Sequence, residues 1–128
     1  MAQASTGVSD VVMSRAELGQ TELPVYAGIP LDRISLVISE SLAEEALAAL
    51  IAADAIGFDT ESKPTFLKGE VSTGPHLVQL ATDSKAYLFP VAPRYDTRAL
   101  KAVLESPKVL KIGFGLGNDH SVLKSRLD

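Results

Sequence analysis

Apolar residues recur with two different periods along this chain, and these periods predict alternating strands and helices. Five short apolar runs predict strands, and they cover residues 34–38, 55–61, 77–82, 86–91 and 109–114. Between the first two runs, apolar residues recur at helical spacing and predict an amphipathic helix over 42–53. Ser41 and Glu44 form a capping-box pattern that predicts the start of this helix.

Two further helices are expected after the fourth strand. Asp96 can cap the first, which ends near Pro107 because the residue before a proline disfavours helical backbone. The second begins near Asp119. Their apolar faces are Leu100, Val103 and Leu104 in the first helix, and Val122, Leu123 and Leu127 in the second. Residues 1–32 show no clear periodicity, so we expect a leader or flexible arm before a domain that spans 33–128.

The links between these elements predict the sheet topology. Residues 83–85 form a link short enough for a hairpin, whereas residues 62–75 form a long loop with two prolines and two glycines. The three strands joined by these links are expected to form an antiparallel meander. The strand–helix–strand links before and after it predict right-handed parallel crossovers. The expected fold is therefore α/β, a mixed sheet with flanking helices.

Composition and charge narrow the classes of protein. The chain has 128 residues, enough for one domain, and contains no cysteine, which excludes disulfides, thiolate metal sites and cysteine nucleophiles. No run approaches the roughly 18 apolar residues of a membrane span, and the first residues lack a signal-peptide core, so we expect a cytoplasmic protein without membrane contact. The net charge of -4 argues against binding nucleic acid by phosphate neutralisation alone. It argues less against a carboxylate site that bound metal would neutralise.

The most informative residues are two carboxylates at the end of the second predicted strand. Asp59 and Glu61 flank one residue, so on a strand both side chains point to the same face. Like charges this close repel unless a positive group lies between them. A divalent cation such as Mg²⁺ or Mn²⁺ fits, because hard cations prefer carboxylate oxygen. The alternative is that one carboxylate caps a turn and the other is solvated.

A glycine-rich segment, residues 111–119, includes the end of the last predicted strand and the turn after it. Its glycines miss the G-x-G-x-x-G spacing of dinucleotide-binding turns, because Asn118 stands at the third glycine position. We interpret the segment as a turn that lets the chain pass close to the sheet. Asp119 would then lie at the carboxyl end of a parallel strand, where ligand sites of such sheets occur. The alternative role of Asp119 is a helix N-cap.

Three segments together resemble a known family. They read AIGFDTESKPTF at 55–66, LVQLAT at 77–82 and AYLF at 86–89. In this order they are similar to the 3′–5′ exonuclease domain family. This ribonuclease-H-like superfamily with four acidic residues includes ribonuclease D, the Werner-type exonuclease and the proofreading domain of DNA polymerase I. Residues 111–123 resemble the second motif of the family, in which a glycine-containing segment leads to an Asp and then a Leu. The resemblance implies a ribonuclease-H-like mixed sheet.

The resemblance also implies a role for each acid. Asp59 resembles the residue that bridges two divalent cations, Mg²⁺ or Mn²⁺, and Glu61 resembles a ligand of the first. Asp119 resembles the second-motif acid that positions the second cation through water. Two such cations supply an activated water and a stabilised leaving oxygen, which hydrolysis of a phosphodiester requires. The implied substrate is the single-stranded 3′ end of DNA or RNA.

Four further residues are candidates for substrate contacts, namely Thr60, Lys63, Phe66 and Gln79. Lys63 and Lys68 in the long loop can meet phosphates, and Phe66 can stack on a terminal base. The alternative is a solvated loop with Phe66 packed at the edge of the core. Gln79 lies among apolar neighbours and can hydrogen-bond either the backbone or the substrate.

The third motif of the family is missing from this sequence. It would be a Tyr or His followed four residues later by an Asp, and no such pair occurs in residues 1–128. We therefore expect an exonuclease domain that is incomplete at its C-terminus, binds metal weakly and has little or no activity as this chain. We also expect exposed apolar surface at an unfinished sheet edge, and hence self-association. The alternative function is a non-catalytic ribonuclease-H-like interaction or scaffold module.

Overall fold

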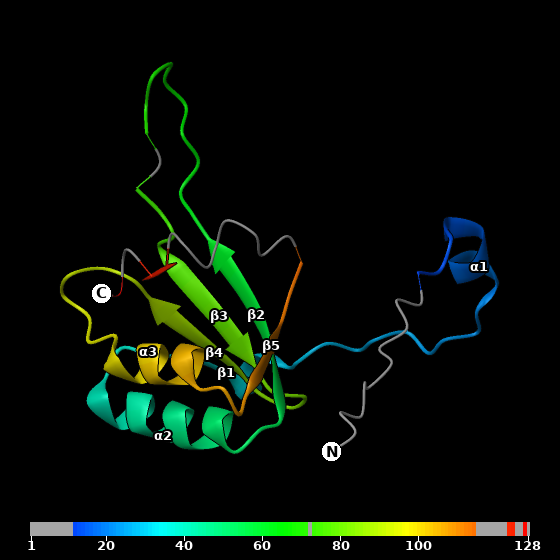
Figure 1. The fold of residues 1–128 in the computed structure, drawn as a ribbon, viewed down its shortest axis with the longest axis horizontal. Coiled ribbons are helices and arrows are strands. Elements are labelled where there is room, and N and C mark those ends of the chain that lie inside the picture. The colour runs from blue at the N-terminus through cyan, green and yellow to red at the C-terminus, as the bar shows by residue number, and fades with distance from the viewer. Residues whose placement is uncertain (1–11, 72, 115–122, 125–126, 128) are drawn as a thin grey trace, which may run out of the picture.

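A five-stranded mixed sheet forms the centre of the protein (Figure 1). The computed structural model describes residues 12–71, 73–114, 123–124 and 127. The strands are β1 (Ile34–Leu36), β2 (Ala55–Glu61), β3 (Leu77–Ala81), β4 (Ala86–Pro90) and β5 (Leu110–Ile112), in the order β1-β4-β3-β2-β5. β2, β3 and β4 form an antiparallel meander, while β1 runs parallel to β4 and β5 parallel to β2. The predicted mixed sheet is confirmed.

Two helices cover one face of this sheet. α2 (Glu40–Ile51) connects β1 to β2, α3 (Arg98–Glu105) connects β4 to β5, and the two helices lie side by side (Figure 1). Every second residue of the meander strands is buried beneath them. The core consists of Val37, Ala46, Leu50, Ile56, Phe58, Val78, Leu80, Tyr87, Phe89, Val91, Leu100, Val103, Val109 and Leu123. The alternation of buried and less buried residues along the strands therefore indicates which face of the sheet the helices cover.

The start of α2 differs from the prediction. Ser39 is the N-cap: its backbone is extended, with φ -133° and ψ 158°, and its side chain accepts a hydrogen bond from the backbone N–H of Leu42 at 3.2 Å. Ser41 already lies inside the helix, where a side chain cannot cap the first turn. The predicted capping box at Ser41 and Glu44 is therefore wrong.

The start of α3 is closer to the prediction. The N-cap by position is Thr97, which makes no capping bond with its side chain. Asp96 accepts the backbone N–H of Arg98 through Oδ1 at 3.0 Å. Asp96 thus satisfies an N–H of the first turn from one position before the cap.

The segment before β1 contains a helix that the sequence pattern did not predict. α1 (Arg15–Gln20) is held by a capping box, in which the side chains of Ser14 and Glu17 each accept the backbone N–H of the other residue. Its residues are all exposed, and it stands apart from the sheet in Figure 1. A single turn of 3-10 helix, η1 (Leu31–Arg33), leads into β1. Within the described residues, no helix has the length and apolar character that crossing a membrane requires.

The second face of the sheet keeps large apolar side chains exposed. Leu36 of β1 is 47% exposed, and Leu110 and Ile112 of β5 are 63% and 56% exposed. The registers place Leu36 beside Leu88 of β4, and Leu110 and Ile112 on the face of β2 that the helices do not cover. This exposure agrees with the expected apolar surface, while self-association itself stays a prediction.

Candidate active site

The candidate site begins at the end of β2, where Asp59 and Glu61 lie on one face of the strand. Burial alternates along β2, so Ile56 and Phe58 point into the core beneath the helices and both carboxylates point to the opposite, exposed face. This is the arrangement that the spacing predicts.

The site lies at one particular edge of the sheet. β1, β2, β4 and β5 all run in the same direction, and only β3 opposes them. Asp59 and Glu61 therefore lie at the carboxyl edge of the parallel strands, where open α/β sheets bind ligands. β5 runs parallel to β2 and pairs with it through Gly57 and Ile112, so its carboxyl end lies at the same edge. Asp119 itself, the third predicted acid, lies outside the described residues.

Within the part of the chain that the structure describes, each of the two carboxylates accepts one hydrogen bond. Oδ1 of Asp59 accepts the backbone N–H of Thr60 at 2.9 Å, and Oε1 of Glu61 accepts Nε2 of Gln79 at 3.4 Å. Neither carboxylate forms an ion pair with a described Lys or Arg. Carboxylate oxygens that form no ion pair with a described Lys or Arg are suitable ligands for a hard divalent metal. Among the described residues, no third acid or histidine joins the pair to complete a metal cluster.

The candidate substrate residues divide between the two faces and the loop. Gln79 lies directly opposite Asp59 in the β2–β3 register, on the same face as the acids. Thr60 is half-buried on the opposite face, so its side chain is separated from the carboxylates. Lys63 and Phe66 lie in the loop that projects beyond β2 and β3 (Figure 1). Phe66 is 85% exposed, which excludes the alternative in which it packs at the core edge.

His76 is a residue of this region for which no sequence pattern predicts a role. Its Nδ1 accepts the backbone N–H of Lys63 at 3.0 Å, and its Nε2 lies 3.0 Å from Oγ1 of Thr73. Its backbone N–H donates to the carbonyl of Glu61 at 2.8 Å. The ring contact to Lys63 connects distant parts of a loop, so no local sequence pattern predicts it.

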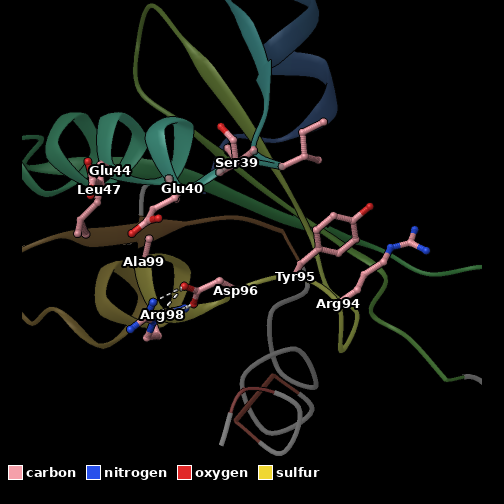
Figure 2. A pocket seen from close by; sticks show the side chains of 12 residues that line it. Ser39, Glu40, Glu44, Leu47, Arg94, Tyr95, Asp96, Arg98 and Ala99 are labelled. Carbon is pink, nitrogen blue, oxygen red and sulfur yellow. Dashed lines mark hydrogen bonds and ion pairs between the residues drawn. The ribbon is translucent and has the colours of Figure 1, made fainter.

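A separate hollow of about 540 Å³ lies between the N-terminal ends of α2 and α3 (Figure 2). Its walls include Glu40 and Glu44 of α2 and, across from them, Asp96 and Arg98. Arg98 Nη2 lies 2.6 Å from Asp96 Oδ2 and lowers the pKa of Asp96 to about 2. The hollow contains neither Asp59 nor Glu61, and its mixed charges favour no single ligand class. The carboxylates on β2, rather than this hollow, therefore mark the candidate site.

A sequence-family model described as 3′–5′ exonuclease matches residues 34–128. The match includes all five strands and both helices of the sheet face. Among proteins with curated descriptions, none matches this sequence.

Solved structures of exonuclease domains share the fold. The EXO domain of Aedes aegypti Nibbler is 30% identical, with a TM-score of 0.64 over 77% of this chain and 46% of that chain. Trypanosoma brucei RNase D in complex with RNA U12 is 23% identical, with a TM-score of 0.62 over 73% of this chain and 34% of that chain. The EXD2 exonuclease domain soaked in Mg and GMP is 19% identical, with a TM-score of 0.55 over 74% of this chain and 50% of that chain. This chain spans half or less of each of these structures.

The sequence match and the fold agree on the same elements. The acidic strand β2 lies between antiparallel β3 and parallel β5, with the helices on the opposite face from its carboxylates. The family match extends over the glycine-rich segment after β5 as well. The chain belongs to the 3′–5′ exonuclease domain family.

Proposed function

We propose that this chain carries the metal-binding part of an exonuclease site that hydrolyses phosphodiester bonds at the 3′ ends of DNA or RNA. The observation that carries the proposal is the placement of Asp59 and Glu61 on one exposed face, at the carboxyl edge of the sheet. Carboxylates on a strand whose other face is buried are held more precisely than carboxylates on a loop. The family of the chain supports the same reaction class.

The proposed cofactor is Mg²⁺ or Mn²⁺, held by Asp59, Glu61 and, outside the described residues, Asp119. When bound, the cations supply the charge that activates water and stabilises the leaving oxygen. Within the chain, Gln79 orients Glu61, and the backbone N–H of Thr60 orients Asp59. A structure of the related EXD2 domain was soaked in Mg and GMP, which supports this choice of metal and a nucleotide ligand.

The proposed partner is a single-stranded 3′ end. Lys63 and Lys68 would meet phosphates and Phe66 would stack on a base, because all three are exposed residues of the loop that begins directly after Glu61. The structure of the related ribonuclease D with RNA supports a nucleic-acid ligand. The half-buried side chain of Thr60 points elsewhere, so its proposed part is the backbone contact to Asp59. We propose the cytoplasm as the location on sequence grounds alone.

A binding and cleavage assay on one substrate tests this function. The substrate is a short single strand with a fluorophore at its 5′ end, presented with Mn²⁺, with Mg²⁺ or with a chelator. We expect weak binding that requires the metal and disappears in Asp59→Ala, with little or no release of nucleotides, because the third motif is missing from residues 1–128. The control is Asp54→Ala, which removes an exposed carboxylate just before β2.

The outcomes separate the two candidate functions. Metal-dependent release of nucleotides that Asp59→Ala abolishes would support the exonuclease and contradict the expected inactivity of this chain. Binding that is equal with chelator and in Asp59→Ala would contradict the metal site. That result would instead favour the non-catalytic interaction module.

A further inference from the structure

The loop between β2 and β3, residues 62–76, forms a long arm whose base lies at the carboxylates. It leaves β2 directly after Glu61 and re-enters the sheet at Leu77, which pairs with Glu61. Figure 1 shows it projecting away from the sheet, beyond the ends of both strands. We call the described residues of this loop, 62–71 and 73–76, the arm. Because its base adjoins Glu61, the conformation of the arm affects which ligands can approach Asp59 and Glu61.

His76 ties the base of the arm together through both its backbone and its ring. Its N–H donates to the carbonyl of Glu61 at 2.8 Å, and its carbonyl accepts the N–H of Val91 at 2.9 Å. Its ring accepts the N–H of Lys63 at Nδ1 and lies 3.0 Å from Oγ1 of Thr73 at Nε2. Since a backbone N–H can only donate, Nδ1 is the unprotonated nitrogen and Nε2 is the donor toward Thr73. One side chain thus connects the outgoing and returning halves of the arm.

The two halves also approach closely at Gly74. A Cβ placed there would overlap the Cβ and Oγ atoms of Ser62, on the outgoing half. Only glycine lets the returning half pass over Ser62 at this separation. The base of the arm is therefore closely packed as well as hydrogen-bonded.

The tip of the arm is shaped by Glu70. Its Oε2 accepts the backbone N–H groups of Phe66 at 3.0 Å and Leu67 at 3.1 Å, and its own N–H donates to the carbonyl of Leu67 at 3.0 Å. These N–H groups, that of Leu67 first, hold the pKa of Glu70 below its usual value. Gly69 completes the turn with φ +84°, a value that favours glycine.

The shaped tip presents apolar side chains to solvent rather than to the core. Phe66 is 85% exposed and Leu67 is 76% exposed. The arm has two lysines and one glutamate, so it carries a net positive charge on a chain of net charge -4. Exposed aromatic and aliphatic side chains beside lysines suit unpaired bases and their phosphates.

We propose that His76 is a positioning residue, which holds the arm so that Phe66 and Leu67 meet the unpaired bases of the 3′ strand beside the carboxylates. This inference rests on the proposed function and adds the residue that aims the substrate contact. His76 touches neither carboxylate with its ring. It acts through Lys63 and Thr73, on either side of the tip.

A single tryptophan can report the stacking directly, because the chain contains none. In Phe66→Trp, indole fluorescence should be quenched when the single-stranded oligonucleotide is added, and a blunt duplex should quench it less. Val25→Trp, at a site that is 95% exposed on the segment before β1, is the matched control and should not respond. Absence of quenching in Phe66→Trp, in a chain that still binds the strand by anisotropy, would overturn the proposal and leave the proposed function standing.

His76 variants in the Phe66→Trp background then test positioning. His76→Phe keeps a ring but removes both hydrogen bonds, so we expect the dissociation constant for the strand to rise at least about fivefold, the lower end of the loss of one base stack. The quenching amplitude should fall with it. His76→Asn keeps an acceptor near the position of Nδ1 and should recover part of both signals. If His76 had a purely structural role, His76→Phe would lower the melting temperature. At temperatures where this variant is folded, its affinity for the strand and its quenching amplitude would equal those of the wild type.

The results distinguish failure of this inference from failure of the proposed function. If neither the wild type nor any variant binds the single strand, the proposed function fails. If the wild type binds and His76→Phe binds equally well with full quenching, His76 has no positioning role. If the strand binds while Phe66→Ala with Leu67→Ala changes nothing, the tip belongs to another surface, such as a protein contact, and the inference is overturned.

Discussion

The Nε2 atom of Gln79 lies 3.4 Å from Oε1 of Glu61, across the β2–β3 pair. Gln79 stands directly opposite Asp59 in the register, so its amide reaches diagonally to the second carboxylate of the same face. The contact uses one oxygen of Glu61, and no described residue donates a hydrogen bond to the other, which could bind a cation. Gln79 thereby fixes the direction of one donor of the proposed metal site.

Replacing Gln79 by Leu should weaken metal binding without unfolding the sheet. Leu keeps similar volume but cannot orient Glu61, and loss of an orienting partner typically costs about tenfold or more in metal affinity. The measurement is Mn²⁺ binding by electron paramagnetic resonance. Ala81→Ser, on the same face of β3 but opposite Gly57, is the control and should leave affinity unchanged. If Gln79→Leu bound Mn²⁺ as tightly as Ala81→Ser and the wild type do, Gln79 would not orient the site.

A second prediction concerns the charge of Asp59. In the absence of metal, Asp59→Asn should leave the melting temperature unchanged or raise it, since the substitution removes repulsion between two carboxylates on one face. With Mn²⁺ added, the wild type should gain stability and Asp59→Asn should not. The gain grows with metal concentration and reaches about 1.4 kcal/mol at roughly ten times the dissociation constant.

Differential scanning fluorimetry across a Mn²⁺ series measures this effect. Asp54→Asn is the matched control, because Asp54 is exposed just before β2 and should respond to metal like the wild type. Stabilisation of Asp59→Asn equal to that of the wild type would place the metal elsewhere.

The strands of the sheet were predicted well because one face of the sheet is buried, and this burial produces an alternating apolar pattern in the sequence. The bounds of β2 agree residue for residue, 55–61, since helices cover one face and the side chains alternate accordingly. The last strand is shorter than predicted: Leu110–Ile112 pairs with β2, whereas Val109 is buried before the strand and Phe114 is fully exposed after it. An apolar run therefore overestimates the length of a strand where buried residues lie outside the segment that pairs with the neighbouring strand.

Helix starts and loop contacts were harder to predict for different reasons. Ser39 and Ser41 are equivalent as cap residues by type, and only the backbone geometry at Ser39 decides between them. α1 has no buried face, so periodicity gives no signal and only the Ser14–Glu17 capping pattern could have revealed it. The contacts of His76 depend on the path of the arm, which no periodic pattern encodes.

Gly74 gives a third prediction, on the stability of the arm. Gly74→Ala would force a Cβ into the side chain of Ser62, so we expect a loss of about 1–3 kcal/mol, as for other overpacked sites. Gly57→Ala is the control, because among the described residues a Cβ there would meet Ala81 alone, at 3.9 Å, an ordinary contact. Urea denaturation measures both. Adding Ser62→Gly to Gly74→Ala should restore much of the loss, and failure to do so would show that the collision is not the cause.

The exposed apolar residues of β5 give a fourth prediction. Leu110 and Ile112 are 63% and 56% exposed on the uncovered face, so the chain should self-associate as its concentration rises. Leu110→Thr with Ile112→Thr places β-branched threonine, which suits a strand, at both positions and removes apolar area. Sedimentation velocity should show less association for this pair than for the wild type. Leu23→Thr, at a site 71% exposed before β1, is the control, and equal association of all three chains would exclude this face.

The ion pair at the start of α3 gives a prediction for acid. The side chain of Arg98, followed by its backbone N–H, lowers the pKa of Asp96 from 3.8 to about 2. Because the folded chain binds this proton less readily than the unfolded chain, the stabilisation is fully present above pH 3.8 and is lost as the pH falls toward 2. A carbon-13 NMR titration of the Asp96 carboxyl measures the shift directly. In Arg98→Leu, the pKa should return toward 3.8, although the backbone N–H still lowers it in part. A pKa that stays near 2 in Arg98→Leu would assign the shift to the backbone rather than to the ion pair.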